Sequence, residues 1–142
     1  MFIKQLSVVL KNVPGKLCEL SEILGAEGVN IRAISVADTS EVSTVRFVVD
    51  DPVKALNILK GHDFSVYETD VLAVETPDHP GGLTAVVRPL KESQVNVLYL
   101  YPYLGRSSDQ AIVILGVDNI EKAQQVLNKN WVHTVGKELY NL

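Results

Sequence analysis

The sequence contains one pattern of residues twice, and this internal repeat constrains the fold more than any other feature. Residues 12–17 read NVPGKL, and residues 78–83 read DHPGGL. Flanking residues match at the same spacing of 66 positions, which becomes 68 after a two-residue insertion. The matching pairs are Leu6 with Leu72, Val8 with Val74, Leu24 with Leu90, Val29-Asn30-Ile31 with Val95-Asn96-Val97, Asp50 with Asp118, Lys54-Ala55 with Lys122-Ala123, and Leu59 with Leu127. Matches in one order over this length indicate two copies of a structural unit.

The first copy has the pattern of a strand, a helix, two strands, a helix and a strand. Alternating polarity over residues 3–10 predicts a half-buried strand. Leu17, Leu20 and Leu24 have the spacing of an amphipathic helix, which Gly28 ends. The remaining expected elements are strands over 29–37, 43–49 and 64–71 and a helix that begins at 50–52.

The second copy repeats this order. Its expected elements are strands over 70–75, 95–103, 110–117 and 131–135 and helices over 81–92 and 119–129. Strand, helix, strand, strand, helix, strand is the order of the ferredoxin-like fold, an antiparallel sheet with both helices on one face. The sequence therefore predicts an α+β protein of two ferredoxin-like βαββαβ units, with domain boundaries at 1–68 and 69–142.

Two prolines bear on the first helix of each copy. Pro14 is expected at the first helical position, where its missing N–H would have had no partner in any case. Pro89 falls inside the second copy's helix, where it removes a hydrogen bond and clashes with the preceding turn. We therefore expect a kink or an early helix end near Arg88.

The repeated Pro-Gly loops have the chemistry of an anion site. The first N–H groups of a helix have no partner within the helix, and the helix dipole adds positive charge at that end. The donors would be the amides of Gly15, Lys16 and Leu17 in the first copy and those of Gly81, Gly82 and Leu83 in the second. Asn12 and Asp78 precede these loops and could hold an ammonium group, so that each loop would accept a free amino acid.

These polar residues also have ordinary structural explanations. Asn12 and Asp78 occupy positions at which a helix cap or an Asx-turn is common. Asn30 and Asn96 open the second strand of each copy between apolar neighbours, where asparagine is disfavoured. A turn residue that closes the helix-to-strand connection would explain them as well as a ligand does, so both interpretations stay open.

On these residues the chain resembles a tandem pair of ACT domains, small βαββαβ modules that sense amino acids and regulate metabolic enzymes. The resemblance rests on NVPGKL followed by GVNI in the first copy and on DHPGGL followed by QVNV in the second. It implies that the units pair side by side into an eight-stranded antiparallel sheet with four helices on one face, and that the effector lies between units. The ligand-binding residues it implies are Asn12, Val13, Pro14, Gly15, Lys16, Leu17 and Asn30 in the first copy, and Asp78, His79, Pro80, Gly81, Gly82, Leu83 and Asn96 in the second.

The resemblance implies a non-catalytic regulatory protein, a homodimer that binds a free amino acid without a cofactor. The single cysteine and the composition are consistent with a cytoplasmic protein. The sequence leaves open which amino acid binds and whether one or both loops are occupied. One alternative keeps the fold and makes the chain a regulatory subunit of an amino-acid biosynthetic enzyme such as acetolactate synthase. A less favoured alternative is an enzyme on a ferredoxin-like fold, for which no titratable group with a geometric partner is evident.

Composition excludes several classes of function. A formal net charge of −4 without a Lys/Arg cluster argues against a nucleic-acid binder. The apolar runs are too short to span a bilayer. Cys18 is the single cysteine, and His62, His79 and His133 lie far apart, so neither a disulfide nor a metal site is expected.

Three tyrosines and the cysteine complete the candidate residues. Tyr99, Tyr101 and Tyr103 alternate along the second copy's second strand and therefore share one face. That face would either be covered by a partner or form an aromatic wall for a ligand. Cys18 lies in the first turn of a helix and is interpreted as a small packing residue.

Overall fold

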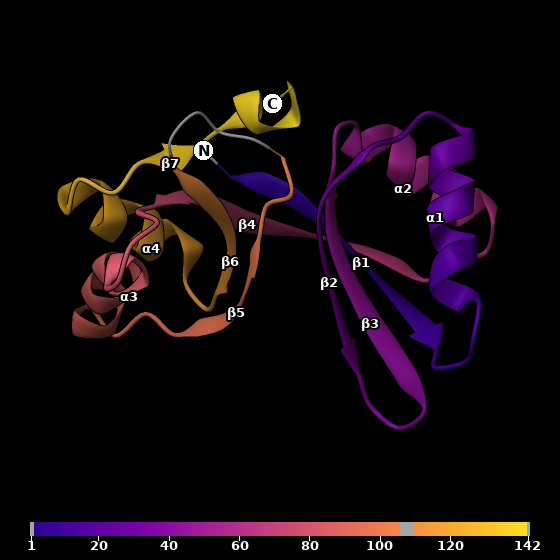
Figure 1. The fold of residues 1–142 in the computed structure, drawn as a ribbon, viewed down its shortest axis with the longest axis horizontal. Helices are drawn as coiled ribbons and strands as arrows, with labels where there is room; N and C mark the ends of the chain where they lie inside the picture. Colours follow the sequence, from indigo (N-terminus) through magenta and orange to yellow (C-terminus); the bar gives the residue numbers. More distant parts are fainter. Residues whose placement is uncertain (1, 106–109, 142) are drawn as a thin grey trace. The chain divides into compact units, whose positions relative to one another are not determined.

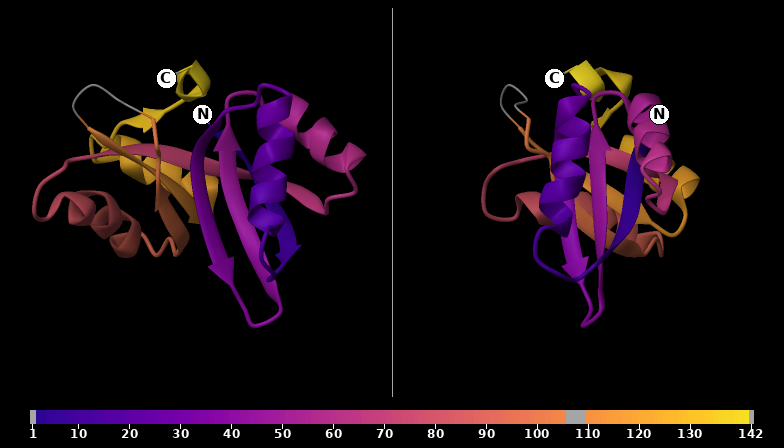
Figure 2. Two further views of the ribbon diagram at one scale, coloured as in Figure 1. Left: turned by 45° about the vertical axis from the view of Figure 1, so that its right-hand side comes forward. Right: turned by 90° about the vertical axis from the view of Figure 1, so that its right-hand side faces the viewer.

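The structure, a computed structural model, describes residues 2–105 and 110–141. Its elements are β1 (Ile3–Lys11), α1 (Lys16–Ala26), β2 (Ile31–Asp38), β3 (Val42–Val49), α2 (Pro52–Gly61), β4 (Val66–Thr76), α3 (Gly82–Glu92), β5 (Val97–Pro102), β6 (Ala111–Val117), α4 (Ile120–Lys129), β7 (Thr134–Val135) and the 3-10 helix η1 (Lys137–Asn141). The chain divides into two compact units. We call Lys4–Thr69 the N-terminal unit, and the residues up to Ile3 together with those from Asp70 onward the C-terminal unit. In each unit, two helices cover one face of antiparallel strands (Figures 1 and 2).

The N-terminal unit has the strand order β2-β3-β1, with β4 next to β1. β3 is antiparallel to both neighbours, and Val45 of β3 lies opposite Val8 of β1 and Val36 of β2. Alternate residues of the strands point toward the helices, as the period of two requires. The buried core that they form with α1 and α2 consists of Leu6, Val8, Leu10, Leu20, Leu24, Val29, Val45, Phe47, Val49, Ala55 and Leu59.

The C-terminal unit has the strand order β4-β6-β5, with β7 on the other side of β4. β6 is antiparallel to both neighbours, and Val74 of β4 lies opposite Val113 of β6. The core between its sheet and helices consists of Leu72, Val74, Val86, Leu90, Val95, Val113, Leu115, Ala123 and Leu127. Most of these positions match those of the other core across the repeat, so the two copies encode the same packing twice.

The described residues form seven strands rather than the eight expected. The strands predicted over 64–71 and 70–75 are one continuous strand, β4, which runs from Val66 to Thr76. No glycine or proline interrupts this segment, so nothing in the sequence stops one extended run. β4 thus ends the first copy and begins the second.

The tyrosine face is part of the interior. Tyr101 and Tyr103 are only 3% and 7% exposed, and the Tyr103 hydroxyl donates to the Leu139 carbonyl in η1 at 3.3 Å. Tyr99 stacks on Tyr101 with ring centroids 6.4 Å apart. Both interpretations of these rings, a partner-covered face and an open wall for a ligand, are therefore wrong for Tyr101 and Tyr103, which the chain itself buries.

The helix α3 does not end near Arg88. It continues through Pro89 to Glu92 and has the same length as α1, 11 residues. Pro89 cannot donate to the Ala85 carbonyl, which therefore lacks its usual helical hydrogen bond. The buried side chains of Val86 and Leu90 on either side of the proline hold the helix against the sheet. The packing of this apolar face outweighs the tendency of Pro89 to end the helix. The expectation of an early helix end is therefore wrong.

Replacement of this proline is expected to stabilise the protein. Pro89→Ala restores a backbone donor inside α3 and should raise the free energy of unfolding by about 2 kcal/mol, after the larger entropy of the unfolded chain is subtracted. Urea denaturation followed by circular dichroism measures the change. Pro52→Ala is the matched control, because Pro52 is the first residue of α2 and its missing N–H has no helical acceptor. A loss of stability in Pro89→Ala would contradict this explanation.

Candidate functional site

The two Pro-Gly loops begin their helices in the same unusual way. Gly15 and Gly81 are the N-cap residues, with left-handed φ angles of 89° and 83°. No side chain within residues 2–105 and 110–141 caps either helix. Capping by Asn12 and Asp78 is therefore wrong, and Pro14 lies before the N-cap rather than at the first helical position, because α1 begins at Lys16.

Asn12 and Asp78 differ in what they contact. The Asn12 Nδ2 donates to the Thr39 carbonyl at 3.2 Å, and the Asn12 amide donates to the Glu41 carbonyl at 3.0 Å. Asn12 thus attaches its loop to the connection between β2 and β3. The exposed Asp78 carboxylate accepts no hydrogen bond from any described residue.

Several amides at these helix starts remain unbonded within the described residues. The loops form two tight turns, in which the Lys16 amide approaches the Val13 carbonyl at 3.5 Å and the Gly82 amide donates to the His79 carbonyl at 2.9 Å. The amides flanking these two donors have no acceptor among the described residues; they are those of Gly15, Leu17, Gly81 and Leu83. Four of the six predicted donors are therefore available to a ligand.

Gly82 has a steric reason to be glycine. A Cβ atom built on it would lie 1.9 Å from the Pro77 carbonyl oxygen. The residue at the matching position of the first copy is Lys16, so only the second loop folds this tightly. The close approach at Gly82 is to the chain's own backbone, and no ligand is needed to explain the residue.

Asn30 and Asn96 are held at the backbone and not at the side chain. The Asn30 amide donates to the Asp50 carboxylate at 3.0 Å, and the Asp50 amide donates to the Asn30 carbonyl at 3.1 Å. Asp118 holds Asn96 in the same way, at 3.0 and 3.1 Å. The two exposed Asn carboxamides bond to no described residue, so they do not close the turn themselves. The sequence carried a signal for these aspartates, because they match across the repeat.

The loop and the asparagine of one unit do not meet. The loop lies at the N-terminal end of the helix, and the asparagine follows its C-terminal end. A helix of 11 residues separates its ends by roughly 16 Å at a rise of about 1.5 Å per residue. The structure therefore does not bring the two halves of the predicted site together within either unit.

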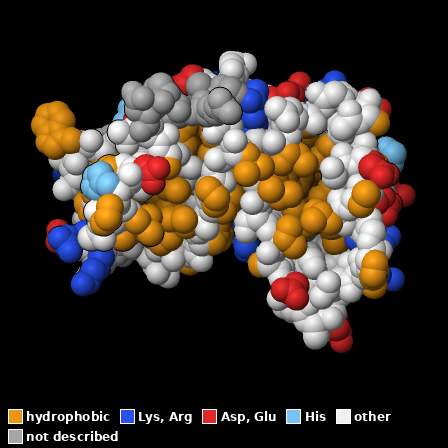
Figure 3. Space-filling view, in the orientation of Figure 1, with side chains coloured by type: hydrophobic (Ala, Val, Ile, Leu, Met, Phe, Trp, Pro, Cys, Tyr) orange, Lys and Arg blue, Asp and Glu red, His pale blue; other side chains and the backbone are white. Residues whose placement is uncertain are grey.

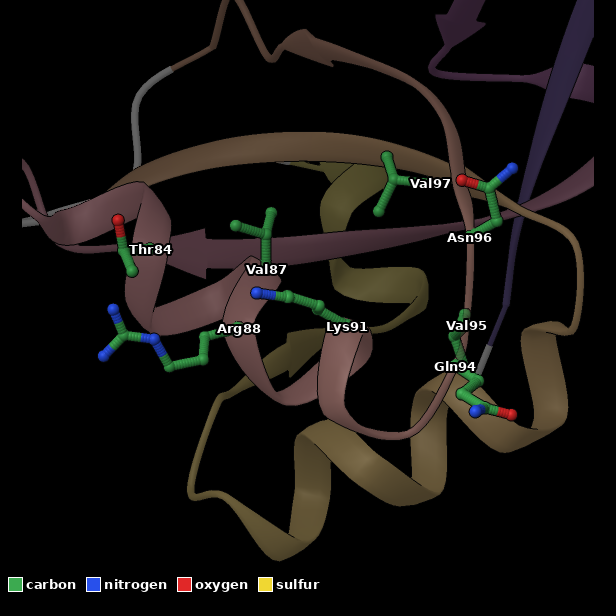
Figure 4. A pocket seen from close by; sticks show the side chains of 8 residues that line it. All are labelled: Thr84, Val87, Arg88, Lys91, Gln94, Val95, Asn96 and Val97. Carbon is green, nitrogen blue, oxygen red and sulfur yellow. The ribbon is translucent and has the colours of Figure 1, made fainter.

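A groove in the C-terminal unit connects these two regions. It has a volume of about 620 Å³ and lies between α3 and the edge strand β5. Val87 and Val97 project into it from its two sides, and Lys91 extends along the helix toward Val87 (Figure 4). Its lining runs from the first turn of α3 to the start of β5 and consists of Thr84, Val87, Arg88, Lys91, Gln94, Val95, Asn96 and Val97. We call this the α3–β5 groove.

Only Asn96 among the predicted site residues lines the α3–β5 groove. The remainder of the second loop precedes the groove along α3. Sequence reasoning missed Arg88 and Lys91, although both stand on the helix that the loop begins. Their spacing of three residues was a usable signal, since it places them on one side of a helix.

Cys18 is exposed, so its interpretation as a packing residue is wrong. Its Sγ donates to the Glu22 carboxylate at 3.2 Å. This hydrogen bond and the negative charge of Glu22 raise the pKa of the Cys18 thiol. A thiol with a raised pKa is a poor nucleophile at neutral pH.

The described part of the chain has neither a metal cluster nor a spanning helix. No three His, Cys, Asp or Glu side chains of residues 2–105 and 110–141 gather as metal ligands would. Within the same residues, no helix combines the length and apolar character that crossing a membrane requires. The chemistry of the candidate site rests on backbone amides, carboxamides and two cations.

Comparison with known proteins gives the family. The profile of the family described as ACT domain pair matches residues 1–142. The chain belongs to the ACT domain pair family. No curated protein sequence matches it.

Several solved structures share the fold. Protein BT0572 from Bacteroides thetaiotaomicron is 34% identical, with a TM-score of 0.92 over 100% of this chain and 98% of that one. The ligand-free regulatory subunit of aspartate kinase from Thermus thermophilus is 14% identical, with a TM-score of 0.61 over 90% and 91% of the two chains. A structure of aspartokinase alpha and beta subunits is 18% identical, with a TM-score of 0.62 over the same shares. The likeness to the aspartate kinase proteins is one of fold.

Proposed function

We propose that this ACT domain pair is a non-catalytic regulatory protein that binds a small free amino acid. The observation that carries the proposal is the pair of helix starts whose amides are left unbonded by any side-chain cap. Such amides favour a carboxylate, both by hydrogen bonding and through the helix dipole. The resemblance to the regulatory subunit of aspartate kinase supports the regulatory role.

Each loop offers more than its amides. The first turn of each helix exposes a leucine, Leu17 at 43% and Leu83 at 47%, beside the free donors. In the second loop the Asp78 carboxylate could accept an ammonium group, whereas Asn12 is already bonded to Thr39. The complete set of carboxylate donors, ammonium acceptor and apolar contact is therefore in the C-terminal unit. We propose that this unit holds the stronger site.

A ligand that binds only the folded chain must raise its stability. At about 100 times its dissociation constant, one amino acid should add about 2.7 kcal/mol to the free energy of unfolding. Thermal unfolding of the full chain with each of the twenty amino acids in turn measures this effect. We expect a small group of related amino acids to raise the melting temperature. A flat panel would contradict the proposed function.

The loop side chains supply the second test. Asn12→Ala combined with Asp78→Ala is expected to abolish the ligand-induced shift, each protein being compared with its own ligand-free state. Asn57→Ala, an exposed asparagine of α2 far from both loops in sequence, is the matched control and should keep the full shift. An unchanged shift in the double variant would remove Asn12 and Asp78 from the site.

The alternative role as an enzyme's regulatory subunit has one supporting observation. The fold likeness covers 91% of the regulatory subunit of aspartate kinase from Thermus thermophilus. Under this alternative, the chain would bind a catalytic chain of an amino-acid biosynthetic enzyme. Co-purification of the tagged protein from its own host with a larger enzyme would favour this role. Recovery of the protein alone, as a homodimer, would favour a stand-alone sensor.

A further inference from the structure

The α3–β5 groove carries two cations that no carboxylate neutralises. Neither the Arg88 guanidinium nor the Lys91 ammonium has an ion-pair partner among the described residues. Both side chains are exposed and line the groove. Among the described residues, no Asp or Glu is part of the groove lining. The groove is therefore a positively charged hollow on a chain whose net charge is −4.

The repeat provides an internal comparison for this charge. The matching positions of α1 hold Glu22 in place of Arg88 and Gly25 in place of Lys91. Glu22 there accepts the hydrogen bond of the Cys18 thiol. The hydrogen bonds between the asparagine and the aspartate are the same in both units, whereas Glu22 carries the opposite charge to Arg88. Figure 3 shows Lys and Arg side chains gathered over α3.

The remaining lining defines the shape of what would fit. Val87, Val95 and Val97 give the groove an apolar floor, and the uncharged polar groups of Thr84, Gln94 and Asn96 stand around it. Arg88 and Lys91 lie three residues apart, so their side chains start about 5–6 Å from each other on one side of the helix. Two cations at this spacing above an apolar floor suit a short carbon chain with a carboxylate at each end.

We propose that the α3–β5 groove selects a dicarboxylic amino acid, and that Arg88 and Lys91 set this selectivity. One carboxylate pairs with the Arg88 guanidinium and the other with the Lys91 ammonium, while the methylene groups rest on the valines. The Asn96 carboxamide oxygen, unbonded in the described residues, accepts from the ligand's ammonium group. The inference goes beyond the proposed function, because it places an amino acid in the α3–β5 groove and not at the Gly81 and Leu83 amides.

Amide analogues of the same shape test the selectivity. Titration calorimetry of the full chain at low ionic strength should give dissociation constants for L-glutamate and L-aspartate at least about tenfold lower than those for L-glutamine and L-asparagine. Raising the salt concentration should weaken the binding of the acids more than that of the amides, because the acids make two exposed ion pairs and the amides one, and salt screens exposed charges. Sulfate at equal ionic strength should not compete, since it lacks the apolar chain.

Charge-neutral variants locate the effect. Arg88→Gln and Lys91→Gln should each raise the dissociation constant of L-glutamate about fivefold, and the double variant about twentyfold or more. L-Glutamine has a single carboxylate, so only the variant that removes the partner of this group should weaken its binding. Glu22→Gln, the matching position of the other unit, and Lys60→Gln on α2 are controls that should change neither ligand. Unfolding curves without ligand confirm that each variant is folded.

The possible results separate this inference from the proposed function. Tighter binding of the acids that is lost in Arg88→Gln and Lys91→Gln supports both. Binding of a neutral or basic amino acid that both variants retain would overturn the dicarboxylate inference and leave the regulatory proposal in place. Absence of binding by all twenty amino acids would overturn the two together.

Discussion

Gly82→Ala is expected to destabilise the protein by about 3 kcal/mol, because the new methyl group cannot be accommodated. Its Cβ would lie 1.9 Å from the Pro77 carbonyl oxygen and 2.9 Å from the carbonyl carbon. Both atoms are backbone, so no side chain can rotate away, and the loop itself must move. The same movement would displace the free amides of Gly81 and Leu83, so loss of ligand binding should accompany the loss of stability.

Gly25→Ala is the matched control for this substitution. Gly25 lies in α1, and nothing lies within 4 Å of the Cβ that would be added. Alanine is a better helix former than glycine, so this variant should gain up to about 1 kcal/mol. The pair is compared by urea denaturation. Equal stabilities of Gly82→Ala and the parent chain would show that the second loop is not packed as the structure has it.

Phe47→Ala should have the other large effect, a loss of about 3–5 kcal/mol. Phe47 is fully buried on β3, at the centre of the core that α1 and α2 form with the N-terminal unit's strands. Removing the ring costs its transfer free energy and leaves a cavity that a sheet packed under two helices cannot close.

Comparison with Phe47→Leu isolates the free-energy cost of the cavity. Leucine keeps most of the buried volume, so its cost should be about 1 kcal/mol. Urea midpoints read by circular dichroism measure both variants. A cost below about 1 kcal/mol for Phe47→Ala would mean that the ring is not part of a tightly packed core.

The repeat was sufficient to predict the order of elements. Apolar residues at the two periods of 2 and 3.6 mark one face of each element, and this signal depends on local spacing alone. The strands expected over 64–71 and 70–75 follow one another without a turn residue, so the sequence already indicated the continuity that β4 has, and only the count of two separate strands was wrong. The sequence also misplaced the end of α3, since the packing of Leu90 outweighs the break expected at Pro89.

The candidate site was less accessible to sequence reasoning. The Pro-Gly loops were found because glycine and proline have fixed conformational roles, and Gly15 and Gly81 do adopt the left-handed region. Arg88 and Lys91 were missed because an exposed cation on a helix resembles any solvated face until a hollow is known beside it. Contact of Asn12 with Thr39 was also out of reach, since the two residues are 27 positions apart.

The central claim is that the free amides at the start of α3 bind the carboxylate of an amino acid. A two-dimensional ¹H–¹⁵N NMR titration of the labelled 15.6 kDa chain, with the amino acid that gives the largest thermal shift, tests it most directly. We predict that the amide signals of Gly81 and Leu83 move with one dissociation constant, while that of Asn57 in α2 stays in place. Signals that move only elsewhere in the chain, with those of Gly81 and Leu83 unchanged at saturation, would contradict it.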